Sequence, residues 1–473
     1  MKIKEFVSKV KKGEIDVFEN TKKVLASLKD IDKEHFYMMH ICEDLALDQA
    51  KKIKNKPVGR LAGVPVTLKD CICVKGVPST SGSKILSGYK PTFNATAVQK
   101  LIDEGAIIIG KTSQDEFGFG ALNTNTGIGI KAPLHPLDKT RVCGGSSGGS
   151  AGITKKADFV HVSLAESTGG SIVCPASFCG VVGFCPTYGR VSRYGLIDYG
   201  SSLDKIGTMA LTVEDAALVL EIISGYDENE STSSDKRVEP FSEYVDTDLK
   251  NLKVGLIMDG FGDGVDEPIK KAVQKVIDSL KKNKVKIEEV NLPLTSKYSL
   301  SCYYLLAMTE ASTNLAKYCG IRYGATTDLK GSFNEFFSKV RSQNMGDEAK
   351  RRIIIGTFAR MAGHRDAYYL RSTKIRTKII EEYKRLFKKY DVLISPTMPI
   401  VAPKFDDVKK LSPLQNFMMD ILIAGPNLAG MPHITLDVAD ERSLPIGLLI
   451  IADHFNESKL VKVASNIEKI VGR

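Results

Sequence analysis

The stretch that decides the fold is Asp158-Phe159-Val160-His161-Val162-Ser163-Leu164, which runs directly towards the turn Thr168-Gly169-Gly170-Ser171. A short apolar run of this kind is typical of a buried strand. Two glycines before a serine are typical of a tight turn, and they leave room around the serine side chain. The N–H groups of residues 168–171 can converge and stabilise an oxyanion. The stretch therefore predicts a strand followed by either a plain turn or the nucleophile of an acyl-transfer site.

Strands and helices alternate on both sides of this stretch. The pattern predicts helices in the first fifty-odd residues, with helical spacing over 20–54, and a mostly helical block over 297–390. This alternation is typical of an α/β fold in which helices cover a sheet. The predicted strands lie at 63–68, 106–109, 158–164, 253–258, 285–290, 391–394, 434–438 and near 446, and further helices lie at 97–104, 213–224 and 268–281.

The whole chain, 1–473, is interpreted as a single domain. Its parts are N-terminal helices over 1–60, a catalytic core over 61–225, a linker or surface insertion over 226–248, a helical insertion over 297–390 and a return to the sheet over 391–473. The polar, turn-rich composition of the stretch 226–248 favours a surface position.

Composition excludes several classes of protein. With 473 residues, 43% apolar and 26% charged, the chain is an ordinary globular protein. Its apolar runs are too short to span a bilayer, and its charged start lacks the core of a signal peptide, so we expect a cytoplasmic protein without a membrane partner. The nine cysteines show no paired or metal-binding spacing, which favours reduced thiols and no metal site. The net charge of +10 permits an acidic partner such as RNA but decides nothing alone.

Two motifs invite other interpretations and fail on their context. Gly144–Ser150 contains G-x-S-x-G centred on Ser147, but the polar residues 136–143 precede it where a nucleophile elbow needs a strand. Residues 105–112 match the phosphate-loop pattern G-x-x-x-x-G-K-T, but the four residues between the glycines are themselves the predicted strand. Neither an α/β-hydrolase elbow nor a nucleotide site is expected.

The general base is expected to be Lys69. None of the seven histidines lies in a context that suggests a base, whereas Lys69 ends an apolar strand and its side chain can point into the protein. Burial disfavours the ammonium form, so a buried Lys69 could accept a proton. The alternative for a lysine at a strand end is a solvated charge.

Three segments, in this order, resemble the signature of the amidase signature family: Pro65-Val66-Thr67-Leu68-Lys69-Asp70, Gly144-Gly145-Ser146-Ser147-Gly148-Gly149-Ser150 and Ser167-Thr168-Gly169-Gly170-Ser171-Ile172. The resemblance extends over nearly the whole chain. It implies the amidase-signature fold, a central mixed sheet covered by helices on both faces. Within the family, the chain is most similar to the glutamine-hydrolysing subunits of tRNA-dependent amidotransferases, through the segments 188–196, 201–207, 310–312, 320–324, 351–357 and 420–430.

The resemblance implies a Ser-cisSer-Lys triad. Ser171 would be the nucleophile, Ser146 the bridging serine after a cis peptide bond, and Lys69 the base. The family's oxyanion hole would fall on the backbone of Thr168, Gly169, Gly170 and Ser171, and no metal is implied. For the substrate glutamine, the matching positions are Arg352 for the carboxylate and Asp420 for the ammonium, with a tyrosine nearby at Tyr303 or Tyr304.

Three positions and one interval depart from the family pattern. Ser167 stands where an aspartate is usual, Val173 where an arginine is usual, and Cys71 where an asparagine is usual. The interval from Ser146 to Ser171 is 25 residues (171 − 146), one more than usual. The missing Asp and Arg would have supported the nucleophile turn, so these departures bear on activity while leaving the three triad residues in place.

The resemblance implies a glutaminase subunit of a heterotrimeric, ATP-dependent amidotransferase, a ligase of protein biosynthesis. It would supply ammonia for the conversion of Glu-tRNA(Gln) to Gln-tRNA(Gln), or of Asp-tRNA(Asn) to Asn-tRNA(Asn). A B subunit would bind the charged tRNA and use ATP and Mg²⁺, a C subunit would hold the assembly together, and this chain would need no cofactor. The alternatives are a free-standing amidase of the same family and a scaffold subunit with weakened catalysis.

Overall fold

The computed structural model describes residues 1–472. Their strands are β1 Met38–Ile41, β2 Pro65–Lys69, β3 Ile107–Thr112, β4 Val162–Ser167, β5 Val182–Cys185, β6 Lys205–Ala210, β7 Lys253–Ile257, β8 Lys286–Val290, β9 Val392–Pro396, β10 His433–Asp437 and β11 Gly447–Ala452. These eleven strands of the described residues form one sheet, in the order β1-β3-β2-β4-β6-β5-β10-β11-β9-β7-β8.

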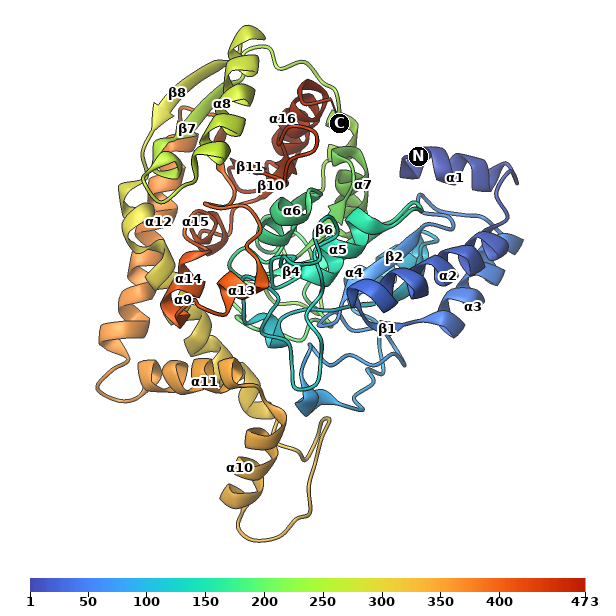
Figure 1. Cartoon of the computed structure of the whole chain (residues 1–473), viewed down its shortest axis with the longest axis vertical. Coiled ribbons are helices and arrows are strands. Elements are labelled where there is room, and N and C mark those ends of the chain that lie inside the picture. The colour runs from blue at the N-terminus through green and yellow to red at the C-terminus, as the bar shows by residue number, and fades with distance from the viewer. Residues whose placement is uncertain (473) are drawn as a thin grey trace.

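Helices surround this sheet, as Figure 1 shows. They are α1 Ile3–Lys11, α2 Val17–His35, α3 Glu43–Asn55, α4 Thr96–Asp103, α5 Gly148–Lys156, α6 Val173–Cys179, α7 Val213–Ile223, α8 Glu267–Lys282, α9 Pro293–Asn314, α10 Phe333–Asn344, α11 Asp347–Arg360, α12 Arg371–Phe387, α13 Phe405–Val408, α14 Pro413–Met418, α15 Ala424–Leu428 and α16 Glu457–Ile470. The predicted α/β fold is confirmed.

The sheet is mixed, and its parallel parts lie at two places. Strands β3, β2 and β4 run parallel to one another, as do β9, β7 and β8, and the pairs between these two groups are antiparallel. Every residue of β2, β3 and β4 is buried, as expected for parallel strands that are covered on both faces. Because β2 and β4 are parallel neighbours, their carboxyl ends meet at one edge of the sheet. Lys69 and Ser167 end these two strands.

The predicted helical stretch 20–54 is wrong in its middle. Helix α2 ends where Phe36 adopts a left-handed conformation, with φ +60°, and its N–H donates to the Asp32 carbonyl. The chain then forms β1, which pairs antiparallel with β3. This edge strand is hidden from a periodicity count, because it has only four residues and lies between two amphipathic helices. Strands β5 and β6 were also absent from the sequence prediction.

The block between β8 and β9 is helical and contains α9, α10, α11 and α12. Strands β8 and β9 both pair with β7. The chain therefore leaves the sheet after β8 and returns on the other side of β7. In Figure 1, α10 and α11 lie at the lower end of the molecule, away from β7 and β8. The stretch 226–248 has one short 3-10 helix, Phe241–Tyr244, and is otherwise irregular.

Two smaller observations concern the sequence expectations. No helix within residues 1–472 combines the length and apolar character that crossing a bilayer requires. All nine cysteines, which lie within the described residues, are free thiols, and eight of them are buried.

Candidate active site

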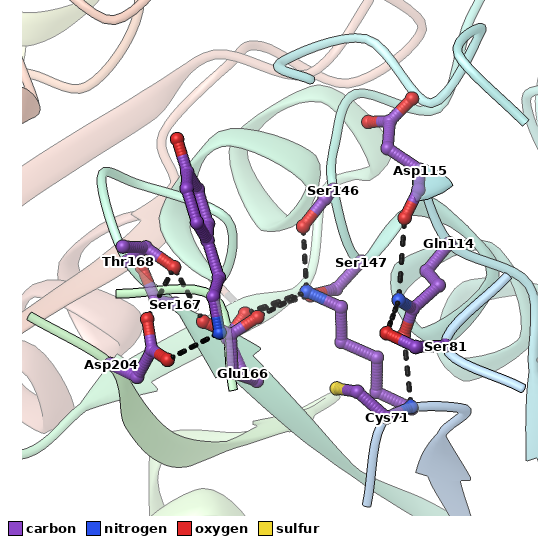
Figure 2. A network of polar contacts seen from close by, with 12 residues as sticks. Cys71, Ser81, Gln114, Asp115, Ser146, Ser147, Glu166, Ser167, Thr168 and Asp204 are labelled. Atoms are coloured by element: carbon purple, nitrogen blue, oxygen red, sulfur yellow. Dashed lines mark hydrogen bonds and ion pairs between the residues drawn. The ribbon is translucent and has the colours of Figure 1, made fainter. Parts of the chain in front are cut away.

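Lys69 lies at the carboxyl end of β2 with its side chain fully buried. Its Nζ donates to Ser146 Oγ at 2.6 Å, to the Glu166 carbonyl at 3.0 Å and to Glu166 Oε2 at 2.8 Å. Figure 2 shows Ser146 and Glu166 directed at the same amine. The expectation that Lys69 points into the protein is confirmed, and the solvated alternative is wrong. The carboxylate partner was not expected.

Ser146 lies in the glycine-rich run and is fully buried. The peptide bond between Gly145 and Ser146 is cis, as the resemblance implied. Helix α5 begins two residues later, and no strand precedes the run, so the context differs from a nucleophile elbow as expected. Ser147 Oγ donates to the Glu166 carbonyl at 3.1 Å, which ties the run to β4. The structure therefore joins Lys69, Ser146 and the end of β4 by direct hydrogen bonds.

Ser171 lies on the turn between β4 and α6 and is 7% exposed. Among residues 1–472, no hydrogen bond joins Ser171 to Ser146. In the same part of the chain, the N–H groups of Thr168, Gly169, Gly170 and Ser171 donate no hydrogen bond. Hydrogen bonds of a catalytic relay are often formed only once substrate is bound.

The two glycines of the turn are required by close packing. A methyl group on Gly169 would overlap the ring of Tyr303 from α9, and one on Gly170 would overlap Ile423. Gly170 also has φ +154°, at the edge of the region that favours glycine. The helical block, through Tyr303, thus packs directly on the turn that carries Ser171.

A cavity of about 360 Å³ adjoins this helical block, and Arg352 of α11 lines it. Arg352 is 3% exposed; its Nε donates to Glu348 Oε1 at 2.8 Å and its Nη1 to Tyr199 Oη at 2.7 Å. Among the described residues, Nη2 has no hydrogen-bond partner. Four aromatic rings surround the guanidinium at 5.1 to 5.8 Å: Phe119, Tyr199, Tyr304 and Phe417. A buried guanidinium with one unpaired nitrogen is suited to a carboxylate ligand.

Asp420 is buried and accepts a hydrogen bond from Tyr304 Oη at 2.6 Å. Burial raises the pKa of Asp420 to about 6, while the Tyr304 hydroxyl and the charge of Arg352 oppose that rise. Tyr304 lines the cavity, and Tyr303 packs on the Ser171 turn. Of the two candidate tyrosines, Tyr304 contacts Asp420 and Tyr303 contacts the turn.

The unusual residues Ser167 and Val173 are accommodated without disturbing these contacts. Ser167 Oγ donates to Asn427 Oδ1 at 3.1 Å, and Val173 is buried at the start of α6. The turn is therefore supported by a hydroxyl–amide contact at the position where the family pattern has a carboxylate. Cys71 is buried as well, and its N–H donates to Gln114 Oε1 at 3.0 Å.

The sequence prediction missed two buried acids of the site. Glu166 contacts Lys69 directly, and its signal is a carboxylate inside a fully buried strand, two residues before the turn. Asp115 lines the cavity and accepts from the N–H groups of Asn123 and Asn125, and burial raises its pKa to about 6. No pattern in the sequence singles out Asp115.

A metal centre has no obvious place here. Among the described residues, no group of three or more His, Cys, Asp or Glu side chains could hold a metal ion together.

Comparison with known proteins places this geometry in a family context. The model of the Amidase family matches residues 19–461. The chain is 44% identical over 443 residues to the A subunit of glutamyl-tRNA(Gln) amidotransferase from Methanococcoides burtonii, covering 93% of this chain and 92% of the relative. It is 43% identical over 451 residues to the protein of the same name from Microcystis aeruginosa, covering 94% and 92%.

Solved structures give the same picture. The crystal structure of the A subunit of glutamyl-tRNA(Gln) amidotransferase from Thermotoga maritima superposes with a TM-score of 0.77 at 33% identity, covering 95% of this chain and 92% of that one. A peptide amidase from Stenotrophomonas maltophilia superposes with a TM-score of 0.82 at 25% identity, covering 100% and 97%.

Proposed function

The chain belongs to the Amidase family, and we propose that it is the glutaminase subunit of a tRNA-dependent amidotransferase. It hydrolyses glutamine and supplies the ammonia that converts Glu-tRNA(Gln) to Gln-tRNA(Gln), or Asp-tRNA(Asn) to Asn-tRNA(Asn). The observation that carries the proposal is the buried contact between Lys69 Nζ and Ser146 Oγ, beside the strand that leads into the Ser171 turn. The 44% identity to the A subunit of a glutamyl-tRNA(Gln) amidotransferase supports the choice of substrate.

In this proposal, Ser171 Oγ attacks the side-chain amide of glutamine. Ser146 takes the proton from Ser171 and passes its own proton towards Lys69, and the same path returns a proton to the leaving ammonia. Water then hydrolyses the acyl-enzyme on Ser171. The four unpaired N–H groups of residues 168–171 support a role as donors to the oxyanion of the tetrahedral intermediate.

Arg352 and Asp420 hold the glutamine at the far end. The unpaired Nη2 of Arg352 supports a contact with the α-carboxylate, and the Asp420 carboxylate suits the α-ammonium. Tyr304 orients Asp420 through its hydroxyl, and Tyr303 holds the turn in place. The α-carboxylate and the α-ammonium of glutamine thus each contact a buried group of opposite charge.

The remaining steps belong to partners. A B subunit would bind the charged tRNA and use ATP with Mg²⁺ to activate the glutamate, and a C subunit would hold the heterotrimer together in the cytoplasm. This chain would contribute only the ammonia-releasing site.

The test is the substitution Ser171→Ala in the assembled complex. Hydrolysis of glutamine should be lost, while transamidation driven by added ammonia should persist, because the partner's chemistry does not need Ser171. Loss of both activities would assign a structural role to the turn and contradict the proposal. A purified single chain that hydrolyses many different amides and binds no partner would instead identify a free-standing amidase.

A further inference from the structure

Glu166 contacts the proposed base and has no role in the proposed mechanism. It lies on β4, 3% exposed, with its Oε2 at 2.8 Å from Lys69 Nζ (Figure 2). We propose that Glu166 is a positioning residue of the proton relay: its carboxylate takes a proton from Lys69 while Lys69 takes one from Ser146, so that the pair, and not the amine alone, is the base. This inference rests on the proposed serine-hydrolase function.

The hydrogen bonds around Nζ fit an ammonium. An ammonium carries three hydrogens and no lone pair, and Nζ has three oxygen partners within 3.0 Å: Ser146 Oγ, the Glu166 carbonyl and Glu166 Oε2. A buried ammonium needs a counter-ion, which the carboxylate supplies. The resting pair therefore has zero net charge and satisfies every hydrogen of the amine.

Thr168 connects Glu166 to a second buried acid, Asp204. Its hydroxyl lies 2.8 Å from Glu166 Oε1 and 2.8 Å from Asp204 Oδ1, yet one hydroxyl has a single hydrogen to donate. Thr168 can therefore donate to only one of the two carboxyl groups at a time. Burial, followed by the charge of Glu166, raises the pKa of Asp204 well above its ordinary value.

The relay balances in protons and electrons. As Ser171 Oγ forms a bond to the substrate carbonyl carbon, the carbonyl π pair moves onto the oxygen. One ammonium proton moves to Glu166 Oε2, which frees the lone pair of Nζ; the Ser146 proton moves to that lone pair, and the Ser171 proton moves to Ser146. Lys69 remains an ammonium, and the charge of the pair rises from zero to +1. When the intermediate collapses, the same chain runs backwards, the C–N bond breaks and ammonia leaves with the returned proton.

This arrangement differs from a lone lysine in one measurable respect. A lone buried lysine must lose a proton to solvent before it can act, whereas the pair is ready while Lys69 is charged. Removing the carboxylate should therefore move the acid limb of the rate profile to higher pH. A carboxylate that merely holds Lys69 in its charged form would do the opposite, because its removal would free the amine at lower pH.

Other titratable groups near the pair must be separated from it. Burial raises the pKa of Asp115 to about 6 and that of Cys185 to about 11, raises the pKa of Cys71, and lowers that of Lys205. Asp70 and Lys111 form their own ion pair at 3.5 Å. By element, the groups that interact electrostatically with the pair are Cys71 after β2, Asp115 on the loop after β3, Cys185 on β5, Asp204 immediately before β6 and Lys205 at its start.

The experiment follows the reaction of Ser171 with a fluorophosphonate, whose serine adduct forms without glutamine. The full-length chain is labelled from about pH 5 to about pH 10, and the rate at Ser171 is measured by mass spectrometry. For Glu166→Gln, which preserves shape, we expect an acid limb at higher pH, with labelling near pH 6 reduced about tenfold and recovered at high pH. A limb that does not move, or moves to lower pH, overturns the proposal.

Three further variants complete the test. Asp70→Asn removes the carboxylate from the buried ion pair of Asp70 and Lys111. The acid limb of its labelling profile should stay at the wild-type pH. Asp115→Asn identifies any contribution of the acid whose pKa is about 6; a limb that moves with this variant and not with Glu166→Gln overturns the proposal. Should Glu166→Gln fail to fold, Glu166→Asp keeps the charge and should keep the limb in place at a lower rate, and a limb that rises with it contradicts the inference.

The readouts separate this inference from the proposed function. Wild-type chain that is labelled at Ser171 with the expected profiles, but does not hydrolyse glutamine in the complex, would refute the substrate and leave the relay intact. Wild-type chain without any labelling at Ser171 would refute both.

Discussion

Two buried lysines on adjacent strands have nearly the same surroundings and different positions in the molecule. Lys69 on β2 contacts a serine hydroxyl, a backbone carbonyl and a carboxylate. Lys111 on β3 does the same, with Ser79 Oγ at 2.8 Å, the Asp70 carbonyl at 3.1 Å and Asp70 Oδ1 at 3.5 Å. Both are fully buried. The set of contacts alone therefore does not distinguish a candidate base from a structural ion pair.

The register of the two strands explains the difference. Leu68 lies beside Lys111 in the parallel pair β2–β3, and Lys69 lies beside Thr112. Because side chains alternate along a strand, this offset of one residue sends the two lysines to opposite faces of the sheet. The face of Lys69 meets the glycine-rich run and the end of β4, and the face of Lys111 meets the segment around Ser79. Position relative to the Ser171 turn makes one lysine a candidate for chemistry.

The largest effect is expected when each lysine is replaced by methionine. Lys69→Met and Lys111→Met should each destabilise the fold by about 3–5 kcal/mol, because each leaves a buried carboxylate unpaired. Only Lys69→Met should also lower kcat for glutamine, by roughly 10²–10⁴-fold, since it removes the relay. Thermal unfolding and a glutaminase assay on both variants check this. An equal loss of kcat in folded Lys111→Met would mean that the two lysines act as one unit.

A third buried cation, Arg352, extends the comparison to binding. Its Nε and Nη1 are paired within the protein and its Nη2 is not, whereas both lysines are fully paired. Arg352→Ala should therefore raise KM for glutamine by at least about thirtyfold, as the loss of a buried charged contact costs roughly 2–5 kcal/mol. Arg341→Ala is the matched control: Arg341 donates to the carbonyls of Leu315 and Tyr318, and its loss should change stability and leave KM unaltered. An unchanged KM in Arg352→Ala would remove Arg352 from the site.

Of these three cations, only Lys69 could be predicted from the local sequence, and its carboxylate partner Glu166 could not. An apolar strand that ends in lysine predicts Lys69, and the glycines before Ser171 predict the turn, whereas Ser146 was assigned by the resemblance. The carboxylate of Glu166 could not be assigned, because its partner is 97 residues away and only the pairing of β2 with β4 brings them together. Arg352 and Asp420 were placed by resemblance alone.

Three strands of the sheet, β1, β5 and β6, escaped prediction, and two of them show the physical reason. Strand β6 begins with Lys205 and contains a glycine and a threonine, so it lacks the apolar run that marks β3. Lys205 is nevertheless buried, since its Nζ donates to the Asn427 carbonyl at 3.3 Å. Strand β1 is four residues long and lies at the edge of the sheet. Local pattern identifies strands covered by apolar layers and misses those whose polar side chains find partners far along the chain.

A smaller effect on KM is expected from a change in pH. It acts through Asp420, a buried acid whose partner is the Tyr304 hydroxyl and not a lysine. Burial raises the pKa of Asp420 to about 6, so its carboxylate is ionised above that pH and protonated below it. Since the ionised form binds the ammonium of glutamine, KM should rise as pH falls below about 6, by about tenfold for each pH unit. In Asp420→Asn, KM should be high and independent of pH. A slope that persists there and disappears in Asp115→Asn would assign the titration to Asp115.

The smallest effect on turnover is expected at Ser79, which is to Lys111 what Ser146 is to Lys69. Ser79→Ala removes one hydrogen bond to a buried ammonium, which costs about 1.5–3 kcal/mol of stability. Lys111 keeps its contacts with Asp70, so the fold should persist with a lower melting temperature and kcat should change by less than about twofold. Ser146→Ala removes the equivalent hydroxyl from Lys69 and should abolish glutamine hydrolysis at a similar cost in stability. If both serines proved equally dispensable for kcat, the proton would reach Lys69 without Ser146, and the face of the sheet would no longer explain why one lysine is catalytic.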